Sequence, residues 1–431
     1  MSAITQLASD HEAVLAALPA GEVSHAARRA TLEMLAEQGL PGPREENWRY
    51  ANLRPLEQLR FTPRLTPDAA ALAQATELLP APLAGFDRYV VVDGLFAAPL
   101  SAPTGTAGDV EVALQAGIDA GYGSAGGDAR FGALASAFAP QAIRVAAGAG
   151  AARDIEVVFV ATAAGSEAAS YPALLVKLAA QAHLRLVERH IGACDAATFA
   201  NAALAIEVGA AGQLRHVRVQ QAGAQATHFE TLRAEVADSA EYLLDTVALG
   251  AQSARSTTHA RLAGRGARIA YSRSVAVDAT RVNDAVVVIE HAAPATITAQ
   301  DYRGIAAGRA RVAFNGHVIM RANAAGSASS QSLRSLLAGP GTEADVRPQL
   351  EIYTDDVKAS HGATAGKIDE QMLFYLLSRG IERRTAQSLL KWAFLTELIA
   401  RIPIPDLRAQ VERAFAQRFT GEDAAVTREL V

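Results

Sequence analysis

The chain has 431 residues, half of them hydrophobic and a fifth charged, which allows two or three structural units and a sizeable buried core. Its 40 Lys and Arg residues against 45 Asp and Glu residues give a net charge of −5. This balance argues against a nonspecific nucleic-acid binder, which needs a basic face. The single cysteine, Cys194, excludes an internal disulfide and a metal site built only from cysteines of one chain.

The hydrophobicity pattern predicts neither a membrane-spanning segment nor a secretory signal. No stretch approaches the roughly 18 to 20 consecutive apolar residues of a membrane helix. Residues 1–10 lack the basic start and the apolar run of a secretory signal. We therefore expect a cytoplasmic protein with neither a membrane nor a nucleic acid as its partner.

Residues 1–60 are expected to form an N-terminal helical region. Ala and Leu recur at helical spacing over residues 12–18 and 27–35, and a segment rich in Gly and Pro then ends the second helix. Residues 61–153 are rich in Ala, Gly and Pro, and their pattern is irregular. This composition predicts a connecting region with short strands around Tyr89–Asp93.

In residues 154–367 apolar and polar residues alternate with a period of two. The alternation occurs in short runs separated by glycine or polar turns, and it predicts strands. Runs at intervals of roughly 10 to 20 residues without helical patterns between them suit a sandwich, a barrel or a right-handed solenoid. The long alternation of small apolar and polar residues, and the position of the Asn-Gly and Gly-Arg-Gly turns, favour the solenoid, although the period alone leaves a sandwich open. The expected fold is mainly β, a right-handed parallel β-helix core flanked by N-terminal and C-terminal helical regions. The runs include Ile155–Val160, His183–Val187, Leu204–Val208, Leu214–Val219, Ala260–Leu262, Ile269–Val277, Val286–Glu290, Val312–Ile319 and Leu350–Tyr353.

Residues 368–431 return to helical spacing and are expected to form a C-terminal helical domain. The first helix has Leu373 and Leu377 on one face, and Gly380 is suited to end it. A second apolar stripe runs from Ala386 to Leu398, and a third amphipathic segment follows the prolines.

The densest polar segment lies between the last predicted strands and the C-terminal helices, at residues 355–364. A Ser-His-Asp triad could be drawn from Ser360, His361 and either Asp355 or Asp356, but adjacent side chains of a strand point to opposite faces. The chain has no Gly-x-Ser-x-Gly elbow, and its ten histidines show no His-x-x-x-His pair on a predicted helix. The alternative interpretation of the segment is a structural turn in which Gly362 adopts a positive φ.

Four blocks of the sequence resemble the SufB/SufD family of iron–sulfur cluster assembly proteins. Residues 348–364 (PQLEIYTDDVKASHGAT) and 373–381 (LFYLLSRGI) carry most of the resemblance. Residues 308–318 (GRARVAFNGHV) are similar to the late β-helix rungs of the family, and residues 45–50 (EENWRY) are similar to a signature of its SufD branch. Where the SufB branch has a cysteine in a Gln-Cys-Asp-Ser block, this chain has Ser332, which favours the SufD branch.

The resemblance implies a non-catalytic scaffold subunit that pairs with a SufB-like paralogue and binds a SufC-like ABC ATPase through its C-terminal helices. An iron–sulfur cluster would be held transiently at the paralogue interface and would not be bound stably by the isolated chain. A homodimer of the isolated chain, the route of iron entry and the binding of a reduced flavin by the complex stay open. The ATPase contacts are expected from Phe374, Tyr375, Leu377, Arg379, Leu390 and Phe394.

The same resemblance assigns His361 a contact with the nascent cluster, because it matches the histidine of the Ser-His-Gly block in the SufD branch. Neutral imidazole can bind iron beside thiolates or carboxylates supplied by a partner. Ala359 stands where some relatives have a cysteine, and Cys194 matches no functional position of the family, so we expect no thiolate ligand from this chain.

A carbohydrate-active enzyme, either a polysaccharide lyase or a hydrolase, is the alternative function, since β-helices also host such enzymes. They need paired carboxylates or Ca²⁺ ligands on neighbouring rungs. The only tight acidic pair in the candidate segment, Asp355 and Asp356, is adjacent in sequence and cannot face one groove from a strand.

Overall fold

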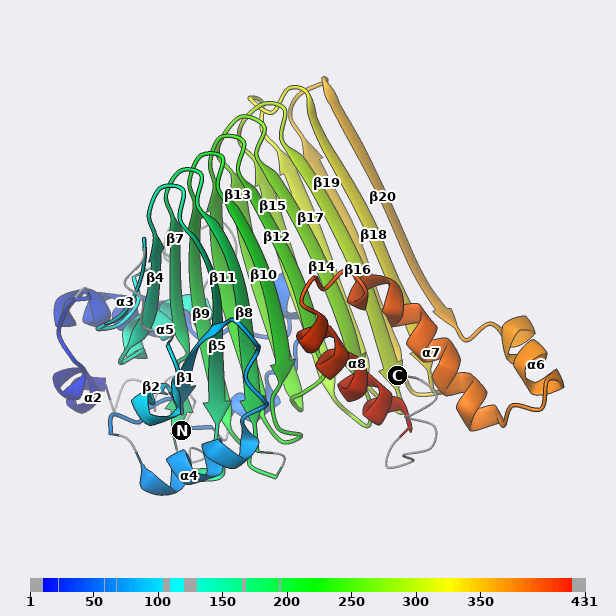
Figure 1. Ribbon diagram of the computed structural model, residues 1–431, viewed down its shortest axis with the longest axis horizontal. Coiled ribbons are helices and arrows are strands. Elements are labelled where there is room, and N and C mark those ends of the chain that lie inside the picture. Colours follow the sequence, from blue (N-terminus) through cyan, green and yellow to red (C-terminus); the bar gives the residue numbers. More distant parts are fainter. Residues whose placement is uncertain are drawn as a thin grey trace.

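The structure, a computed structural model, describes residues 11–21, 23–57, 59–66, 68–103, 109–119, 130–164, 168–193 and 195–420. Two 10-stranded sheets wind around a common interior as a parallel β-solenoid, with helices packed at both ends of the chain (Figure 1). The predicted mainly β fold with a parallel β-helix core is therefore confirmed, and the sandwich is wrong. We call the space between the two sheets the lumen.

Sheet 1 forms the wall that faces the viewer beside the C-terminal helices in Figure 1. Its strands, in spatial order, are β2 (Leu95–Phe96), β1 (Asp87–Val92), β5 (Ala152–Ala161), β8 (His183–Gly192), β10 (Gln213–Gln221), β12 (Glu241–Ala248), β14 (Arg268–Val277), β16 (Ile297–Ala307), β18 (Ser327–Ala338) and β20 (Val357–Lys367).

Sheet 2 forms the opposite wall and ends beside the last strand of sheet 1. Its strands, in spatial order, are β19 (Glu343–Ile352), β17 (Arg311–Met320), β15 (Val282–His291), β13 (Ser253–Leu262), β11 (Thr227–Val236), β9 (Phe199–Val208), β7 (Ala173–Leu178), β4 (Ala142–Ala147) and β3 (Val110–Gln115), with β6 (Ala169–Ser170) paired to β9.

The register of the solenoid stacks equivalent residues of successive rungs. In sheet 1, Glu188 pairs with Arg218, Arg218 with Thr246, and Thr246 with Arg273. The differences between these residue numbers, 30, 28 and 27, give the length of one rung. Because the strands are parallel and in register, each inward-facing side chain lies directly above the inward-facing side chain of the previous rung.

The solenoid differs at its two ends. At the first rungs, β2 pairs antiparallel with β1 and β3 pairs antiparallel with β4, so short strands cover both sheet edges. The segment 61–153 thus contributes β1 to β4 to the same two sheets. At the last rung, β19 and β20 each have a neighbour on one side only.

An N-terminal layer of helices packs on the outer face of sheet 2. Trp48 is 1 % exposed; its ring lies 5.2 Å from that of Phe131, and the Arg255 guanidinium sits 4.3 Å from its ring centroid. These contacts anchor the EENWRY block to β13. The elements of this layer and of the connecting segment are α2 (His11–Ala17), α3 (His25–Gln38), η1 (Glu46–Trp48), η2 (Arg54–Glu57), α4 (Ala69–Leu78), η3 (Ala98–Leu100) and α5 (Arg130–Phe138).

Three C-terminal helices follow β20: α6 (Glu370–Ser378), α7 (Arg383–Ile399) and α8 (Pro405–Thr420). α7 and α8 pack on the outer face of sheet 1, where Leu395 and Phe415 join a buried cluster with Val217 and Val247. α6 extends away from the solenoid at the right of Figure 1. Gly380, with φ of 81°, follows α6, as its sequence position predicts.

Buried His291 makes folding stability depend on pH. Its two ring nitrogens lie 2.8 Å from Thr296 Oγ1 and 3.0 Å from Thr298 Oγ1, and burial lowers the pKa of His291 to about 4. The unfolded chain, with a histidine pKa of about 6.5, then binds more protons between these values. The stabilisation is therefore complete above about pH 6.5 and is lost as the pH falls towards 4.

We expect the free energy of unfolding to fall by about 3 kcal/mol over this range because of His291 alone, since each pKa unit corresponds to about 1.4 kcal/mol. His291→Gln should remove this part of the pH dependence, as measured by urea unfolding at pH 7, 5.5 and 4.5. His183→Gln, which replaces an exposed histidine, is the matched control. An identical slope for His291→Gln and the unchanged protein would contradict the prediction.

Candidate functional site at the open end of the solenoid

The last rung presents two long strand edges that no other strand of the described chain covers. β19 has 10 residues and β20 has 11, and both are exposed or half-buried along their whole length. Unpaired backbone N–H and C=O groups on such an edge are a template for another strand. Pro348 in β19 and Lys358 and Lys367 in β20 are residue types that discourage indiscriminate edge pairing. The edge is therefore suited to a selective partner.

His361 lies in the middle of β20, not in a junction loop, so the interpretation of this segment as a turn is wrong. Gly362 is not among the described glycines with positive φ, and no atom lies within 4 Å of the position that a Cβ would occupy there. His361 pairs in register with Gln331 of β18, whose side chain points into the lumen. The imidazole therefore lies on the lumenal face of an exposed edge, with Ala359 and Ala363 as its small neighbours on that face.

The lumen behind His361 is polar. Gln331 Nε2 donates to Gln300 Oε1 and to the carbonyl oxygen of Gly316, both at 2.9 Å. The Tyr302 hydroxyl and the Ser335 hydroxyl are also buried. An interior of this kind holds polar groups that water or a polar ligand can satisfy.

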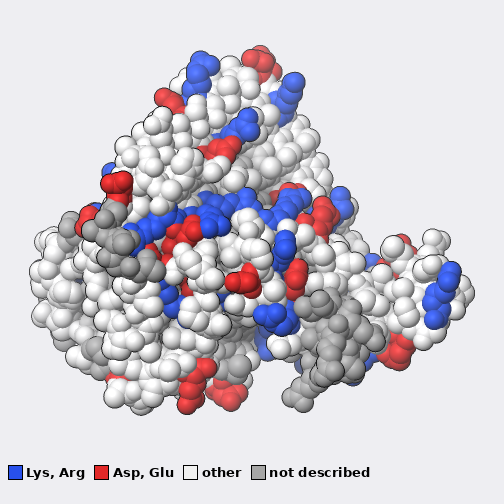
Figure 2. Space-filling model, viewed as in Figure 1, with Lys and Arg blue, Asp and Glu red and all other residues white. Residues whose placement is uncertain are grey.

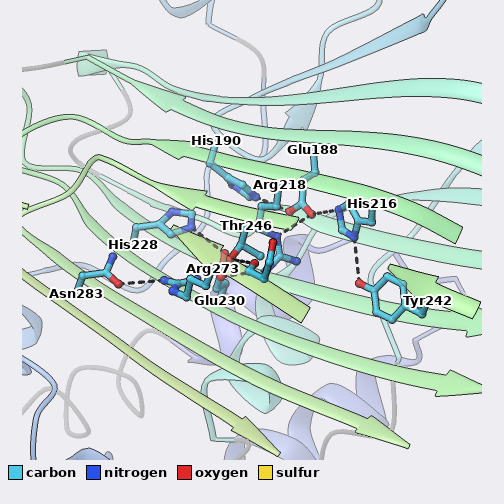
Figure 3. A network of polar contacts seen from close by, with 11 residues as sticks. Glu188, His190, His216, Arg218, His228, Glu230, Tyr242, Thr246, Arg273 and Asn283 are labelled. Carbon is cyan, nitrogen blue, oxygen red and sulfur yellow. Dashed lines mark hydrogen bonds and ion pairs between the residues drawn. The ribbon is translucent and has the colours of Figure 1, made fainter. Parts of the chain in front are cut away.

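Deeper in the solenoid the polar lumen contains a buried ionic cluster (Figure 3). Arg218 donates to Glu188 Oε2 and to Glu230 Oε1, each at 3.0 Å, and so joins the two sheets across the lumen. Glu188 also accepts from His190 at 2.5 Å and from His216 at 2.9 Å. All five of these side chains are buried.

The ionisation states of the cluster follow from these contacts. Burial alone would raise the pKa of Glu188, but the Arg218 charge and the hydrogen bonds of His190 and His216 hold that pKa well below its usual value. Burial would also raise the pKa of Glu230, and Arg218 and His228 lower it. Burial lowers the pKa values of His216 and His228. The two carboxylates are thus charged at neutral pH, whereas these two imidazoles are neutral.

No motif considered in the sequence pointed to this cluster, although its residues carry a local signal. Glu188 and His190 are spaced by two on β8, and His228 and Glu230 are spaced by two on β11. Such spacing places both side chains of each pair on one face of a strand. Only the solenoid register brings the two pairs together.

A second exposed feature lies on α6. Phe374, Tyr375 and Met372 are 72 %, 57 % and 58 % exposed, and Leu373 is the buried residue of the helix. Arg379 is exposed and its guanidinium lies 5.2 Å from the Tyr375 ring centroid. The α6 end of the molecule is mostly uncharged in Figure 2.

The other residues predicted to contact the ATPase are less accessible. Leu377, Leu390 and Phe394 are half-buried, and Phe394 packs against the cluster that joins α7 to sheet 1. The exposed apolar surface predicted for the C-terminal helices is therefore concentrated on α6.

The wall that carries α7 and α8 is charged but balanced. Lys and Arg side chains form a band across this face, interleaved with Asp and Glu (Figure 2). Asp154 pairs with Arg185, Arg215 pairs with Asp245 at 2.8 Å, and Arg303 of β16 pairs with Glu397 of α7 at 2.8 Å. Much of this basic charge is thus neutralised by ion pairs within the molecule.

The other residues considered in the sequence analysis do not form a common site in the structure. Ser360 and His361 lie on opposite faces of β20, and Asp355 and Asp356 lie in the bend before it, so the drawn triad does not form. Ser332 pairs with Gly362 and lies on the face of β18 opposite to Gln331. Cys194 lies outside the described residues. Among the described helices, none is both long and apolar enough to cross a membrane.

Comparisons with known proteins agree on one family. Residues 159–394 match the family model for the SufBD core domain of SUF-system FeS cluster assembly. The chain is 29 % identical over 409 residues to the iron-sulfur cluster assembly protein SufD of Escherichia coli, covering 90 % of this chain and 92 % of that protein. It is 28 % identical over 274 residues to an iron-sulfur cluster assembly SufBD family protein of Mycobacterium bovis, covering 61 % of this chain and 68 % of that protein.

Proposed function

The chain belongs to the SufB/SufD family of iron–sulfur cluster assembly proteins and is SufD-like, and from this premise we propose that it is a non-catalytic scaffold subunit. In this role it pairs with a SufB-like paralogue, binds a SufC-like ABC ATPase and acts in the cytoplasm. The iron–sulfur cluster is the cargo of the assembly, shared transiently with the paralogue.

The observation that carries the proposal is the free edge of the last rung with His361 on its lumenal face. A paralogue of the same fold can add its own edge strand there, because main-chain hydrogen bonds then satisfy both edges. The open space around Gly362 lets a partner backbone approach next to His361. An imidazole at this seam supplies one iron ligand, and the partner supplies the others.

The same edge can also pair with a second copy of the chain. In the absence of the paralogue, β19 and β20 are available to a second copy of the same chain. We therefore expect the isolated chain to form a homodimer that the paralogue displaces.

The ATPase is assigned to α6. Three large apolar side chains on a short helix that stands away from the solenoid are the pattern of a helix face that docks in a partner groove (Figure 1). α7 and α8, in contrast, already use their apolar faces on sheet 1. Movement of an ATPase bound to α6 could be transmitted to β20, which immediately precedes it.

The carbohydrate-active enzyme receives less support. Membership in an iron–sulfur assembly family favours the scaffold. The bend that holds Asp355 and Asp356 is not a pair of stacked rungs, which is what acid–base catalysis on a polysaccharide would use.

Copurification separates the two functions. The chain should be coexpressed with a cysteine-bearing SufB-like protein and a SufC-like ATPase, purified through the chain itself and reconstituted anaerobically with iron and sulfide. We expect a complex of all three proteins that acquires a cluster. Isolation of the chain without either partner, together with cleavage of uronic-acid polymer, would reverse the assignment.

Cys194 provides a negative prediction for the same assay. A lone thiol without a neighbouring ligand pattern is a poor cluster anchor. Cys194→Ser should therefore leave the cluster content of the reconstituted complex within about twofold of the unchanged protein, measured from iron and sulfide analysis. Complete loss of the cluster would show that this chain supplies a thiolate after all.

A further inference from the structure

Two histidines and a glutamate meet inside the lumen, many rungs away from His361. His190 comes from β8 of sheet 1, and His228 and Glu230 come from β11 of sheet 2 (Figure 3). One ligand atom from each of the three side chains lies within 4.8 Å of the others. The three residues are 3 %, 2 % and 4 % exposed. We propose that His190, His228 and Glu230 bind one divalent first-row transition-metal ion inside the solenoid.

The first argument is a distance. His228 Nε2 lies 3.4 Å from Glu230 Oε2, which is longer than the usual N–H···O hydrogen bond of about 2.7 to 3.2 Å. Two ligands held at about 2.0 to 2.1 Å from a tetrahedral ion are about 3.3 Å apart. The pair is therefore spaced as two ligands of one ion, and it makes only a weak hydrogen bond without that ion.

The second argument is the orientation of His190. Its Nε2 lies 2.5 Å from Glu188 Oε1, and this contact leaves Nδ1 as the ring nitrogen that can bind an ion. A carboxylate that accepts from one ring nitrogen while the other binds metal is the usual outer arrangement of metal-binding histidines. The ring is also held by Phe159, whose centroid lies 4.9 Å away in a stacked geometry.

The third argument is the orientation of the Glu230 carboxylate. Arg218 contacts Glu230 Oε1, so Oε2 is the oxygen that faces His228.

The fourth argument is space. A cavity of about 20 Å³ is lined by both histidines, together with Phe159, Thr198 and Ala200. This volume is sufficient for one water molecule, which needs about 10 to 15 Å³ on the same measure. A water molecule in this cavity would lie beside the two imidazoles and could serve as a further ligand of the ion.

The donor set decides the class of ion. Two imidazoles and one carboxylate suit Zn²⁺, Fe²⁺ or Co²⁺, whereas Mg²⁺ and Ca²⁺ require mainly oxygen ligands. The positive charge of Arg218 near Glu230 opposes a second cation, so we expect a single ion. This site goes beyond the proposed scaffold function, because it uses neither the last rung nor α6.

Metal binding is tested with the tag-free, chelator-stripped chain that carries His361→Ala and Cys194→Ser, so that neither the edge imidazole nor the thiol contributes. Co²⁺ is the spectroscopic probe, and Zn²⁺ is the competitor. We expect one Co²⁺ per chain with visible d–d bands, displaced by Zn²⁺. Glu230→Gln and His228→Ala should each weaken binding at least tenfold. His291→Gln, which replaces another buried histidine, should bind as the parent does.

Two readouts keep the test independent of folding defects in the variants. Zn²⁺ at a hundredfold excess over its Kd should raise the Tm of the parent by about 3 °C, as expected for a ligand that binds only the folded chain of this length. X-ray absorption of the Zn²⁺-loaded parent should show two imidazoles and no sulfur. The site would be overturned if the parent binds no stoichiometric metal, or if its spectrum shows fewer than two imidazoles. Unchanged metal binding by both ligand variants would also overturn it. Partner binding in the copurification assay is expected to be the same whichever result is obtained, so the two proposals fail separately.

Discussion

His361→Ala should leave the complex with the SufB-like and SufC-like partners assembled and yet strongly reduce its cluster content after anaerobic reconstitution. The side chain is exposed on β20 and its truncation leaves no buried group without a partner. One side chain at the rim of an interface usually contributes under about 1 kcal/mol to association. Its loss as a ligand, in contrast, removes a donor that no thiolate of this chain near the edge can replace. We expect at least a fivefold decrease in iron and sulfide per complex.

Two further variants separate ligation from a merely structural effect. His361→Cys restores a soft ligand of shorter reach and should recover part of the cluster. Ser360→Ala changes the adjacent residue on the opposite face of the same strand and should have no effect. If His361→Ala builds clusters at the normal level, the ligands come from the partner alone.

Replacing Phe374 and Tyr375 together by Gln should abolish capture of the SufC-like ATPase. Large aromatic anchors at protein interfaces typically contribute about 2 kcal/mol or more each, so the double change predicts roughly thousandfold weaker binding. Because the two rings are 72 % and 57 % exposed, their loss should not disturb the solenoid. Pull-down and calorimetry measure the binding, and far-UV circular dichroism checks the fold.

The control for this variant replaces two exposed apolar side chains elsewhere in the molecule. Leu114 of β3 and Ile297 of β16 are 47 % and 40 % exposed, and their double replacement by Gln should leave ATPase binding unchanged. Retained binding by the α6 variant would place the ATPase on another surface. Loss of binding in both double variants would point to a general effect of the substitutions.

The sequence predicted the β-solenoid and the C-terminal helices because each shows its own period. α7 has a single apolar stripe, and the outer face of sheet 1 supplies the apolar surface that this stripe covers. The strand pattern was partly hidden, since many inward positions are polar. β11 reads THFETLRAEV, and its inward His228 and Glu230 disrupt the expected alternation of apolar and polar residues. The predicted runs are therefore shorter than the strands, and none of them covers β11. β7, β12, β16, β18 and β20 also lack a predicted run.

The last strand was difficult for the opposite reason. β20 reads VKASHGATAGK and is exposed on both faces, so it has no apolar face for a pattern to reveal. Its block of residues was nevertheless the most distinctive for the family, and the resemblance pointed to His361 without showing that it lies in a strand. The buried cluster around Arg218 depends on residues about 30 positions apart being stacked in register, and a local pattern cannot provide that register.

The one-sided pairing of β20 gives the molecule a gradient of local stability along its axis. An interior strand such as β12 has neighbours on both sides, whereas β20 is held by β18 alone. In stacked-repeat proteins the free energy of local opening is a sum of nearest-neighbour contributions, so terminal repeats open most readily. The backbone around His361 can therefore open and close without unfolding the rest of the chain. A subunit that adds a strand there would suppress this opening, so that the site becomes rigid only when the second subunit is present.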